Sequence, residues 1–162
     1  FPSEVDNPSE VGTDRIVNSL CAWNLYKKPT IIIDLGTATT FDIVGNKGAY
    51  IGGIIAPGVN LSMMALHQAA ARLPRVAIKK PENVIGKNTV SAMSSGIYWG
   101  YVGLIENLIN KIENELNYKM HVVATGGLAK LFISQISKNI VLNNDLTIHG
   151  LFMAYQESII IK

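Results

Sequence analysis

An acidic residue and a cluster of threonines separate two strongly β-forming segments early in the chain. Asp34 follows three consecutive isoleucines, so we expect it where a buried strand reaches the surface. A carboxylate at such a place is costly unless it is paired or binds a cation. Gly36 allows a ligand to approach the main chain closely, and Thr37, Thr39 and Thr40 would offer donors to phosphate oxygens. Residues 34–40 therefore favour a site that binds phosphate and a cation. A turn-capping aspartate in a hairpin is the alternative.

A second acidic residue lies beside an arginine in the segment GTDR, residues 12–15. The segment combines a glycine with the predicted start of a helix. In this position Asp14 would act as a general base. The planar guanidinium group of Arg15 would donate hydrogen bonds to an anion or a carbonyl group. The alternative is that Asp14 only stabilises the helix N-terminus.

Three further segments combine glycines or hydroxyl groups with predicted turns. GGIIAPG, residues 52–58, would form either a pocket wall or a hairpin end that leads into a helix. The TGG turn, residues 125–127, follows a strand and opens a helix, which suits a nucleotide. Asn88 and Thr89 precede a long helix, where capping is the alternative to ligand binding. The chain contains no dinucleotide fingerprint, and valine and asparagine stand where a P-loop needs lysine and Ser/Thr.

Composition narrows the function class. The 162 residues suit one domain or half of a two-domain fold, and 48% hydrophobic with 16% charged residues excludes a disordered chain. A net charge of only +2 argues against a nucleic-acid binder. The single cysteine, Cys21, cannot form an internal disulfide or supply a zinc or Fe–S site, so we expect a reduced, cytoplasmic protein. No apolar run reaches the roughly 18 residues of a membrane span.

The elements that would position these residues follow from periodicity and turn signals. Residues 1–12 read as an extended lead-in. Strands are expected at 31–33, 40–44, 49–55, 121–125 and 140–143. Helices are expected at 13–26, from the residue after Gly58 to before Pro74, at 89–116, 126–137 and 146–160. In the second of these helices, an inner stripe is predicted at Leu61, Met64, Ala65, Gln68 and Ala69.

This order of elements predicts an α/β fold with a mixed sheet flanked by helices. A run of hairpin-connected strands comes first, and helices then alternate with strands. The succession resembles half of the ribonuclease-H-like fold of the actin-like kinase superfamily.

The motifs taken in series closely resemble the type III pantothenate kinases. The segments are NPSEVGTDR, DLGTATTFDIV, GGIIAPG, LPRV, IGKNTVSAMSSGIYWGYVGLIE and TGG, and the resemblance covers nearly all of the chain. It implies an ATP-dependent transferase that phosphorylates pantothenate to 4'-phosphopantothenate, the first step of coenzyme A biosynthesis. It also implies a homodimer, a monovalent cation such as K⁺ or NH₄⁺, and Mg²⁺ with ATP.

The resemblance assigns the substrate side to two segments. The G-x-D-R segment of the family contacts pantothenate, which here implies Gly12, Thr13, Asp14 and Arg15. Asp14 would be the proton acceptor. The threonine of the family's G-x-N-T segment also contacts pantothenate, and this implies Thr89.

The resemblance assigns the nucleotide side to the D-x-G-T segment and to the TGG turn. The acid that opens the first segment handles the cation in the family, which implies Asp34. The threonine three residues later contacts ATP, which implies Thr37, with Gly36 beside it. The TGG turn, through Gly126, would lie near adenosine.

One departure from the family concerns its first segment. The family begins with another strand and a D-x-G-N-type loop that holds ATP phosphates and metal, and no such segment precedes Phe1. We therefore expect a C-terminal half, with residues 1–28 as lead-in and interdomain helix and 29–162 as the ribonuclease-H-like domain. Its partner would be the N-terminal half of the same protein, and the isolated fragment would be inactive.

Two other functions remain open. A non-catalytic regulatory or accessory relative should tolerate the loss of Asp14 and Asp34, and this chain keeps both. A related kinase acting on a sugar is disfavoured by the pair of G-x-D-R and G-x-N-T segments.

Overall fold

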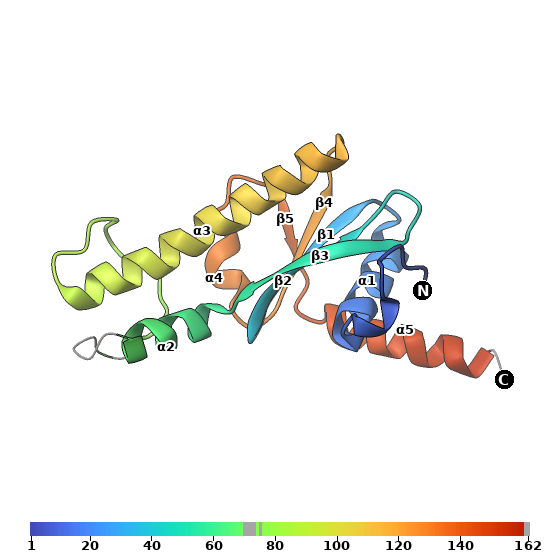
Figure 1. Cartoon of the computed structure of the whole chain (residues 1–162), viewed down its shortest axis with the longest axis horizontal. Helices are drawn as coiled ribbons and strands as arrows, with labels where there is room; N and C mark the ends of the chain where they lie inside the picture. Colours follow the sequence, from blue (N-terminus) through green and yellow to red (C-terminus); the bar gives the residue numbers. More distant parts are fainter. Residues whose placement is uncertain (70–73, 75, 161–162) are drawn as a thin grey trace.

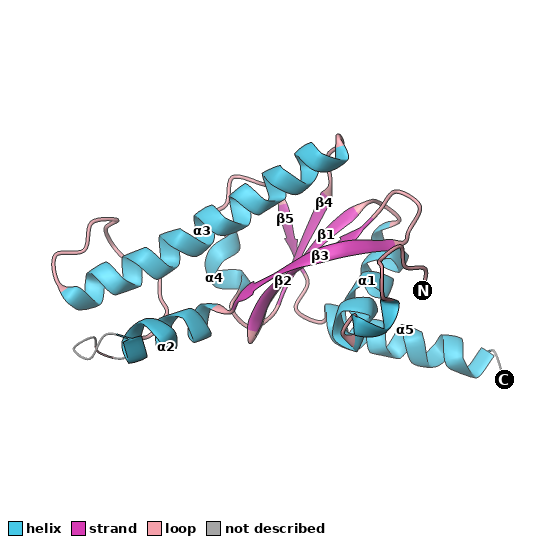
Figure 2. Cartoon of the chain, in the orientation of Figure 1, coloured by secondary structure: helices cyan, strands magenta, loops and turns pink. Residues whose placement is uncertain are grey.

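The computed structural model describes residues 1–69, 74 and 76–160, which form a five-stranded sheet with helices on both faces (Figures 1 and 2). The strands are β1 (Thr30–Leu35), β2 (Ala38–Val44), β3 (Tyr50–Pro57), β4 (His121–Thr125) and β5 (Ile140–Leu142). The helices are the single 3-10 turn η1 (Pro8–Glu10), α1 (Thr13–Tyr26), α2 (Val59–Ala69), α3 (Thr89–Leu116), α4 (Ala129–Ile133) and α5 (Leu146–Ile160). All the strands and helices predicted from the sequence are present, although α4 is much shorter than predicted.

The sheet is mixed, with strand order β3-β2-β1-β4-β5. β1, β2 and β3 form an antiparallel meander, and β4 and β5 run parallel to β1. The predicted mixed sheet flanked by helices is therefore confirmed, and the order is that of the ribonuclease-H-like fold.

The central strand β1 is buried on both faces, which explains its run of isoleucines. Ile31 and Ile33 pack into the larger core, which α3 and α4 cover, whereas Ile32 packs into the smaller core with residues of α1 and α5. Successive side chains of a strand point to opposite faces. The α1 face of the sheet therefore continues from Ile32 to Asp34.

The strand register carries further polar side chains to that same face. Asp42 of β2 lies opposite Ile32, and Thr40 lies opposite Asp34. Directly opposed residues of an antiparallel pair share a face. Polar groups of β1 and β2 therefore meet beneath α1.

Helix α1 is packed tightly into this face. It ends where Lys27 adopts a left-handed conformation with φ 50, shortly before Pro29. On its outer side it meets α5, where a Cβ at Gly150 would overlap with the Val17 carbonyl oxygen. The predicted boundary between residues 28 and 29 thus falls directly after a helix that packs on the sheet, and the boundary itself stays a prediction.

Helix α2 differs from its predicted packing. Val59 and Met63 are its buried residues, whereas Leu61 and Met64 of the predicted inner stripe are about half exposed, so that stripe is wrong. The helix extends beyond the end of the sheet (Figure 2), so little of its apolar surface has a partner. The predicted end of α2 before Pro74, and part of the LPRV segment, lie outside the described residues.

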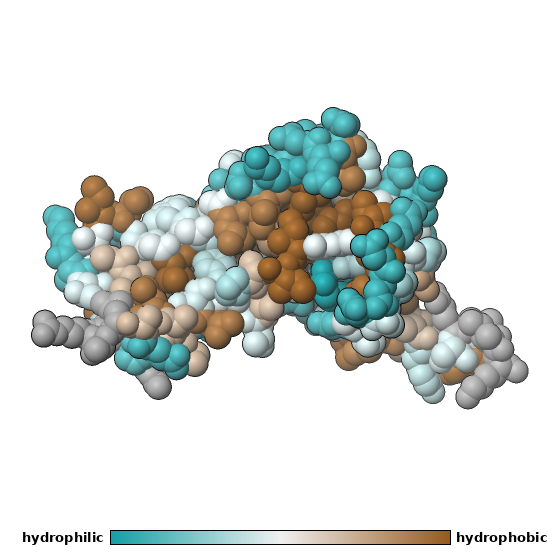
Figure 3. All heavy atoms as spheres, viewed as in Figure 1, coloured by the Kyte–Doolittle hydropathy of each residue, from teal (hydrophilic) through white to brown (hydrophobic). Residues whose placement is uncertain are grey.

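Large exposed hydrophobic side chains gather in two places. The first includes the end of β3, α2 and the start of α3, with Ile55, Leu61, Met64, Leu66, Val84, Ile85 and Val90. Figure 3 shows hydrophobic atoms at this end of the molecule and where β3 passes α3. The second is one stripe of α5, with Ile148, Leu151, Phe152, Tyr155 and Ile159. No helix of the described residues is long and apolar enough to cross a membrane.

A buried carboxylate ties the end of α3 to the segments around β4. Glu113 accepts hydrogen bonds from Lys119 at 2.7 Å, from Lys138 at 2.9 Å and from the Met120 N–H at 3.2 Å. Burial opposes ionisation of this carboxyl group, but the three donors outweigh it and lower the pKa of Glu113 to about 2. The stabilisation is therefore complete above the ordinary carboxyl pKa and is lost as the pH falls toward the folded value.

We expect Glu113→Gln to lower the free energy of unfolding near neutral pH by about 1–3 kcal/mol, because charge-assisted hydrogen bonds are lost. Thermal melts across the acidic range measure the effect, and the deficit should shrink as the pH falls. Glu115→Gln, at an exposed site on the same helix, is the control. A deficit independent of pH would contradict the ionic role of Glu113.

Candidate functional site

The candidate site lies where β1 and β4 end beside the start of α1. β1 and β4 are parallel, with Asp34 opposite Thr125, so their carboxyl ends meet at one edge. Ligands of open α/β sheets bind outside the carboxyl ends of the strands. Asp14 is exposed in the first turn of α1 and completes this edge.

Asp34 experiences the negative charges of two other carboxylates. Burial, followed by the charges of Asp14 and Asp42, raises the pKa of the Asp34 carboxyl above its ordinary value. A hydrogen bond with the Asn18 side chain partly opposes this rise. Asn18 is itself held by the Thr147 hydroxyl of α5, which donates to its Oδ1 at 2.7 Å. The site therefore concentrates negative charge that a cation would relieve.

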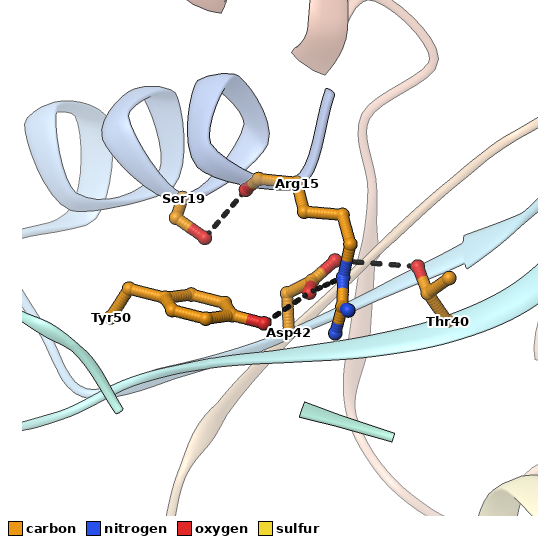
Figure 4. A network of polar contacts seen from close by, with 5 residues as sticks. All are labelled: Arg15, Ser19, Thr40, Asp42 and Tyr50. Atoms are coloured by element: carbon orange, nitrogen blue, oxygen red, sulfur yellow. Dashed lines mark hydrogen bonds and ion pairs between the residues drawn. The ribbon is translucent and has the colours of Figure 1, made fainter. Parts of the chain in front are cut away.

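Arg15 lies in a polar network beneath α1 (Figure 4). Its Nε donates to Asp42 Oδ1 at 2.6 Å. The Tyr50 hydroxyl donates to the same oxygen at 3.2 Å, and the Thr40 hydroxyl donates to Asp42 Oδ2 at 3.3 Å. Burial raises the pKa of the Asp42 carboxyl, and Arg15, Tyr50 and Thr40 oppose the rise. Burial likewise raises the pKa of Tyr50 to about 12.

The spacing of α1 explains how residues of one helix reach both acids of the sheet. Residues four apart lie on one side of a helix. Asp14 and Asn18 act on Asp34, whereas Arg15 reaches Asp42. Residues from one short part of α1 therefore interact with acids on two neighbouring strands, β1 and β2.

The turn between β1 and β2 exposes Gly36 and Thr37 at its tip. It rests against Gly58, where a Cβ would overlap with the Thr37 carbonyl oxygen. Thr39 is fully buried. The prediction that its hydroxyl offers a donor to phosphate is therefore wrong, because alternate strand residues face the core. Thr40 is half-buried and bonded to Asp42.

Gly126 follows β4 and lies against Asp34. Its φ is 93, which favours glycine, and a Cβ there would come within 2.6 Å of Asp34 Oδ1. The TGG turn therefore closes over the acid at the end of β1, and its glycine is required by the close approach.

Thr89 is the one predicted site residue that the structure does not bring to this edge. It is exposed and begins α3, whose N-terminal end lies at the opposite end of the molecule from α1 (Figure 1). The helix cap belongs to its neighbour: Asn88 accepts from the Ser91 N–H at 2.9 Å in a capping box. Thr89 is thus free of the capping role that was its alternative.

Asp34 is the predicted metal-binding residue, and it could contact a cation at this edge of the sheet. No group of three or more His, Cys, Asp or Glu side chains in the described part of the chain could hold a metal. One partly buried carboxylate, at Asp34, has a pKa raised by burial and by other negative charges. Carboxylate oxygens are among the ligands that hard cations prefer.

Sequence reasoning assigned no role to Asn18, Asp42 or Tyr50. The signal available was the alternation of β2, which predicts that Asp42 shares a face with Thr40. The pairing of Asp42 with Arg15 spans 27 residues of sequence, and that of Asn18 with Thr147 spans 129. Neither could be obtained from local spacing.

Comparison with known proteins identifies relatives over most of this chain. The family model described as type III pantothenate kinase matches residues 1–111. The type III pantothenate kinase of Acidiphilium cryptum is 57% identical over 151 residues, which cover 93% of this chain and 57% of the relative. That of Paramagnetospirillum magneticum is 54% identical over 154 residues, 95% of this chain and 59% of the relative. The chain thus spans slightly under three fifths of these relatives' length.

Solved structures share the fold at low sequence identity. A conserved protein of Campylobacter jejuni, assigned to the Baf family of transcriptional activators, superposes with a TM-score of 0.68 at 20% identity, covering 98% of this chain and 69% of that one. A filament structure of Alp12 gives a TM-score of 0.59 at 14% identity, covering 85% of this chain and 51% of that one. At these identities the likeness concerns the fold alone.

Proposed function

The chain belongs to the type III pantothenate kinase family, and from this we propose that its protein transfers the γ-phosphate of ATP to the primary hydroxyl of pantothenate. The observation that carries the proposal is the meeting of Asp14, Asp34 and the exposed Gly36-Thr37 turn at one edge of the sheet. At that edge the exposed carboxylate of Asp14 lies near a turn, Gly36-Thr37, that could bind phosphate.

Asp14 is the proposed general base. It accepts the proton of the pantothenate hydroxyl as the oxygen attacks the γ-phosphorus. A bond forms between this oxygen and phosphorus, the bond from phosphorus to the β,γ-bridging oxygen breaks, and ADP leaves. Arg15, Gly12 and Thr13 form the substrate side of the same helix start. Exposure of Asp14 supports this role, because a base must reach the substrate.

The nucleotide side is assigned to the residues around Asp34. Asp34 would hold a monovalent cation, K⁺ or NH₄⁺, whose positive charge would offset the negative charge of the ATP phosphates, and Mg²⁺ would be bound with ATP. Thr37 and Gly36 would receive phosphate oxygens, and Gly126 would lie toward adenosine. The raised pKa of Asp34 supports this assignment. None of the groups that change this pKa is a basic side chain, so a cation would find the carboxylate without a positively charged partner. Phosphoryl transfer depends chiefly on such positioning and charge neutralisation. We also propose that the N-terminal half typical of the family completes the ATP site.

A homodimer reconciles Thr89 with a substrate role. We propose that the partner subunit's Thr89 completes the pantothenate site, since α3 begins far from α1 (Figure 1). The apolar side chains exposed around α2 and the start of α3, among them Met64 and Ile85, support an interface at that end. A cytoplasmic location, and inactivity of residues 1–162 by themselves, remain part of the proposal.

An assay of the intact protein with ATP and pantothenate tests the proposed function. We expect ADP release that requires pantothenate and increases with K⁺ or NH₄⁺. Release that is independent of pantothenate, or that follows a sugar instead, would contradict it. Complete lack of turnover under all these conditions would favour the non-catalytic alternative.

Thr89→Val should raise the KM for pantothenate more than the KM for ATP. Loss of one neutral hydrogen bond is worth about 0.5–1.5 kcal/mol, or roughly 2- to 12-fold in KM. Ser91→Ala is the matched control, because it weakens the helix cap and leaves the Thr89 hydroxyl in place. Equal shifts of both KM values in Thr89→Val would mean that Thr89 contacts no substrate.

A further inference from the structure

Arg15 of α1 forms an ion pair with Asp42 of the sheet, whose carboxylate has no exposure to solvent. The Nε–Oδ1 distance to Asp42 is 2.6 Å, and the Asp42 side chain is 0% exposed whereas that of Arg15 is 14% exposed. Asp42 is therefore too deeply buried to touch a substrate. Arg15 is the only member of this pair that reaches the surface.

Both oxygens of Asp42 are used inside the protein. Tyr50 donates to the same oxygen as Arg15, and Thr40 donates to the other. The guanidinium carbon of Arg15 also lies 5.8 Å from the centroid of the Tyr50 ring. Figure 4 shows these groups converging from α1 and from two adjacent strands. The carboxylate is fixed from several sides, so the arginine that it binds is fixed as well.

The guanidinium group of Arg15 also lies close to the backbone of β3 at Gly53. A Cβ at Gly53 would overlap with Arg15 Nη2 and with the Phe41 carbonyl oxygen, so only glycine leaves room for the arginine. Nη2 is buried and has no hydrogen-bond partner among the described residues. An unpaired buried donor is rare in a structure that serves packing alone. The arrangement constrains the guanidinium plane without saturating its donors.

We propose that Asp42 is a positioning residue that holds Arg15 in one orientation for the pantothenate substrate. The inference rests on the proposed function for the identity of the substrate, and on the geometry for the hold on Arg15. A fixed guanidinium fork loses less freedom when it binds a ligand than a mobile one does. Asp42 thus acts through Arg15 and does not contact the reacting atoms.

The test compares Asp42→Asn with wild type in the intact protein. The amide keeps the size of the carboxylate and one acceptor oxygen but removes its charge. Charge-assisted hydrogen bonds of this kind correspond to about 10- to 150-fold in affinity, so we expect the KM for pantothenate to rise by at least roughly tenfold. The KM for ATP should change less than about threefold. Glu113→Gln is the matched control, since it removes a buried, ion-paired carboxylate elsewhere in the fold.

A second measurement reads the hold on Arg15 without any substrate. Modification by phenylglyoxal, followed at Arg15 by mass spectrometry, should be slow in wild type and several-fold faster in Asp42→Asn, while circular dichroism confirms that both are folded. Equal labelling rates would overturn the inference, as would parallel shifts of both KM values in Asp42→Asn and Glu113→Gln. If wild type fails to phosphorylate pantothenate, the proposed function fails, and the labelling rates still decide whether Asp42 holds Arg15.

Discussion

Asp14→Asn is expected to reduce kcat by about 10²- to 10⁴-fold while the fold is retained, because loss of a general base costs this much. The carboxylate lies in the first turn of α1, where a Cβ at Gly12 would come within 2.6 Å of its Oδ1. The side chain thus lies over the glycine that opens the helix, where it is exposed to a substrate. Initial rates at saturating ATP, pantothenate and K⁺ measure the effect.

Asp145→Asn is the matched control for this change. Asp145 is an exposed aspartate directly before α5, so its replacement removes a similar charge from a helix start outside the candidate site. We expect its kcat to remain within about threefold of wild type, far less than the loss of a base would cost. A similarly small effect of Asp14→Asn would mean that Asp14 only stabilises the helix end.

Asp34→Ala should weaken ATP binding and abolish activation by monovalent cations together. The carboxylate stands at the carboxyl end of β1 against Gly126, beside the turn that exposes Thr37. Removing it takes away the proposed ligand of the cation that would balance the negative charge of the phosphates. Titrations of rate against K⁺ at several ATP concentrations measure both effects. Asp34→Asn, which keeps the shape and removes the charge, should behave in the same way.

The pH dependence of cation activation adds an independent check on Asp34. Its pKa is raised above the ordinary carboxyl value, so a larger share is protonated at mildly acidic pH. Below the folded pKa the group is neutral, and activation should disappear as the pH falls through that value. In Asp34→Asn, cation activation should show no such dependence on pH. An unchanged K⁺ response in either variant would retire the cation role.

Local patterns in the sequence were sufficient for the elements and for part of the site. The isoleucine run before Asp34 predicted β1, and the apolar repeat of residues 89–116 predicted α3, because burial and periodicity are encoded within one segment. The turn at Gly36 and Thr37 was likewise visible from residue types alone. These features depend on neighbours in sequence.

Contacts between distant segments were beyond the reach of the same reasoning. The hold of Asp42 on Arg15 requires the register of β1 against β2 and the placement of α1 over both. The buried state of Thr39 follows from strand alternation, but the cluster of threonines suggested a shared role. In α2 the periodicity correctly predicted a helix but not the face that is buried. Tertiary packing buries Met63 and leaves Leu61 exposed.

The central claim is that this protein places a phosphate on the primary hydroxyl of pantothenate, with Asp14 as the base. The most direct measurement is ³¹P NMR with mass spectrometry of the product formed by the intact protein from ATP and pantothenate, in wild type and in Asp14→Asn. The account predicts a single monophosphate ester, 4'-phosphopantothenate, from wild type and almost none from the variant. A phosphorylated product other than this ester, or the same ester at equal yield and rate from Asp14→Asn, would contradict the account.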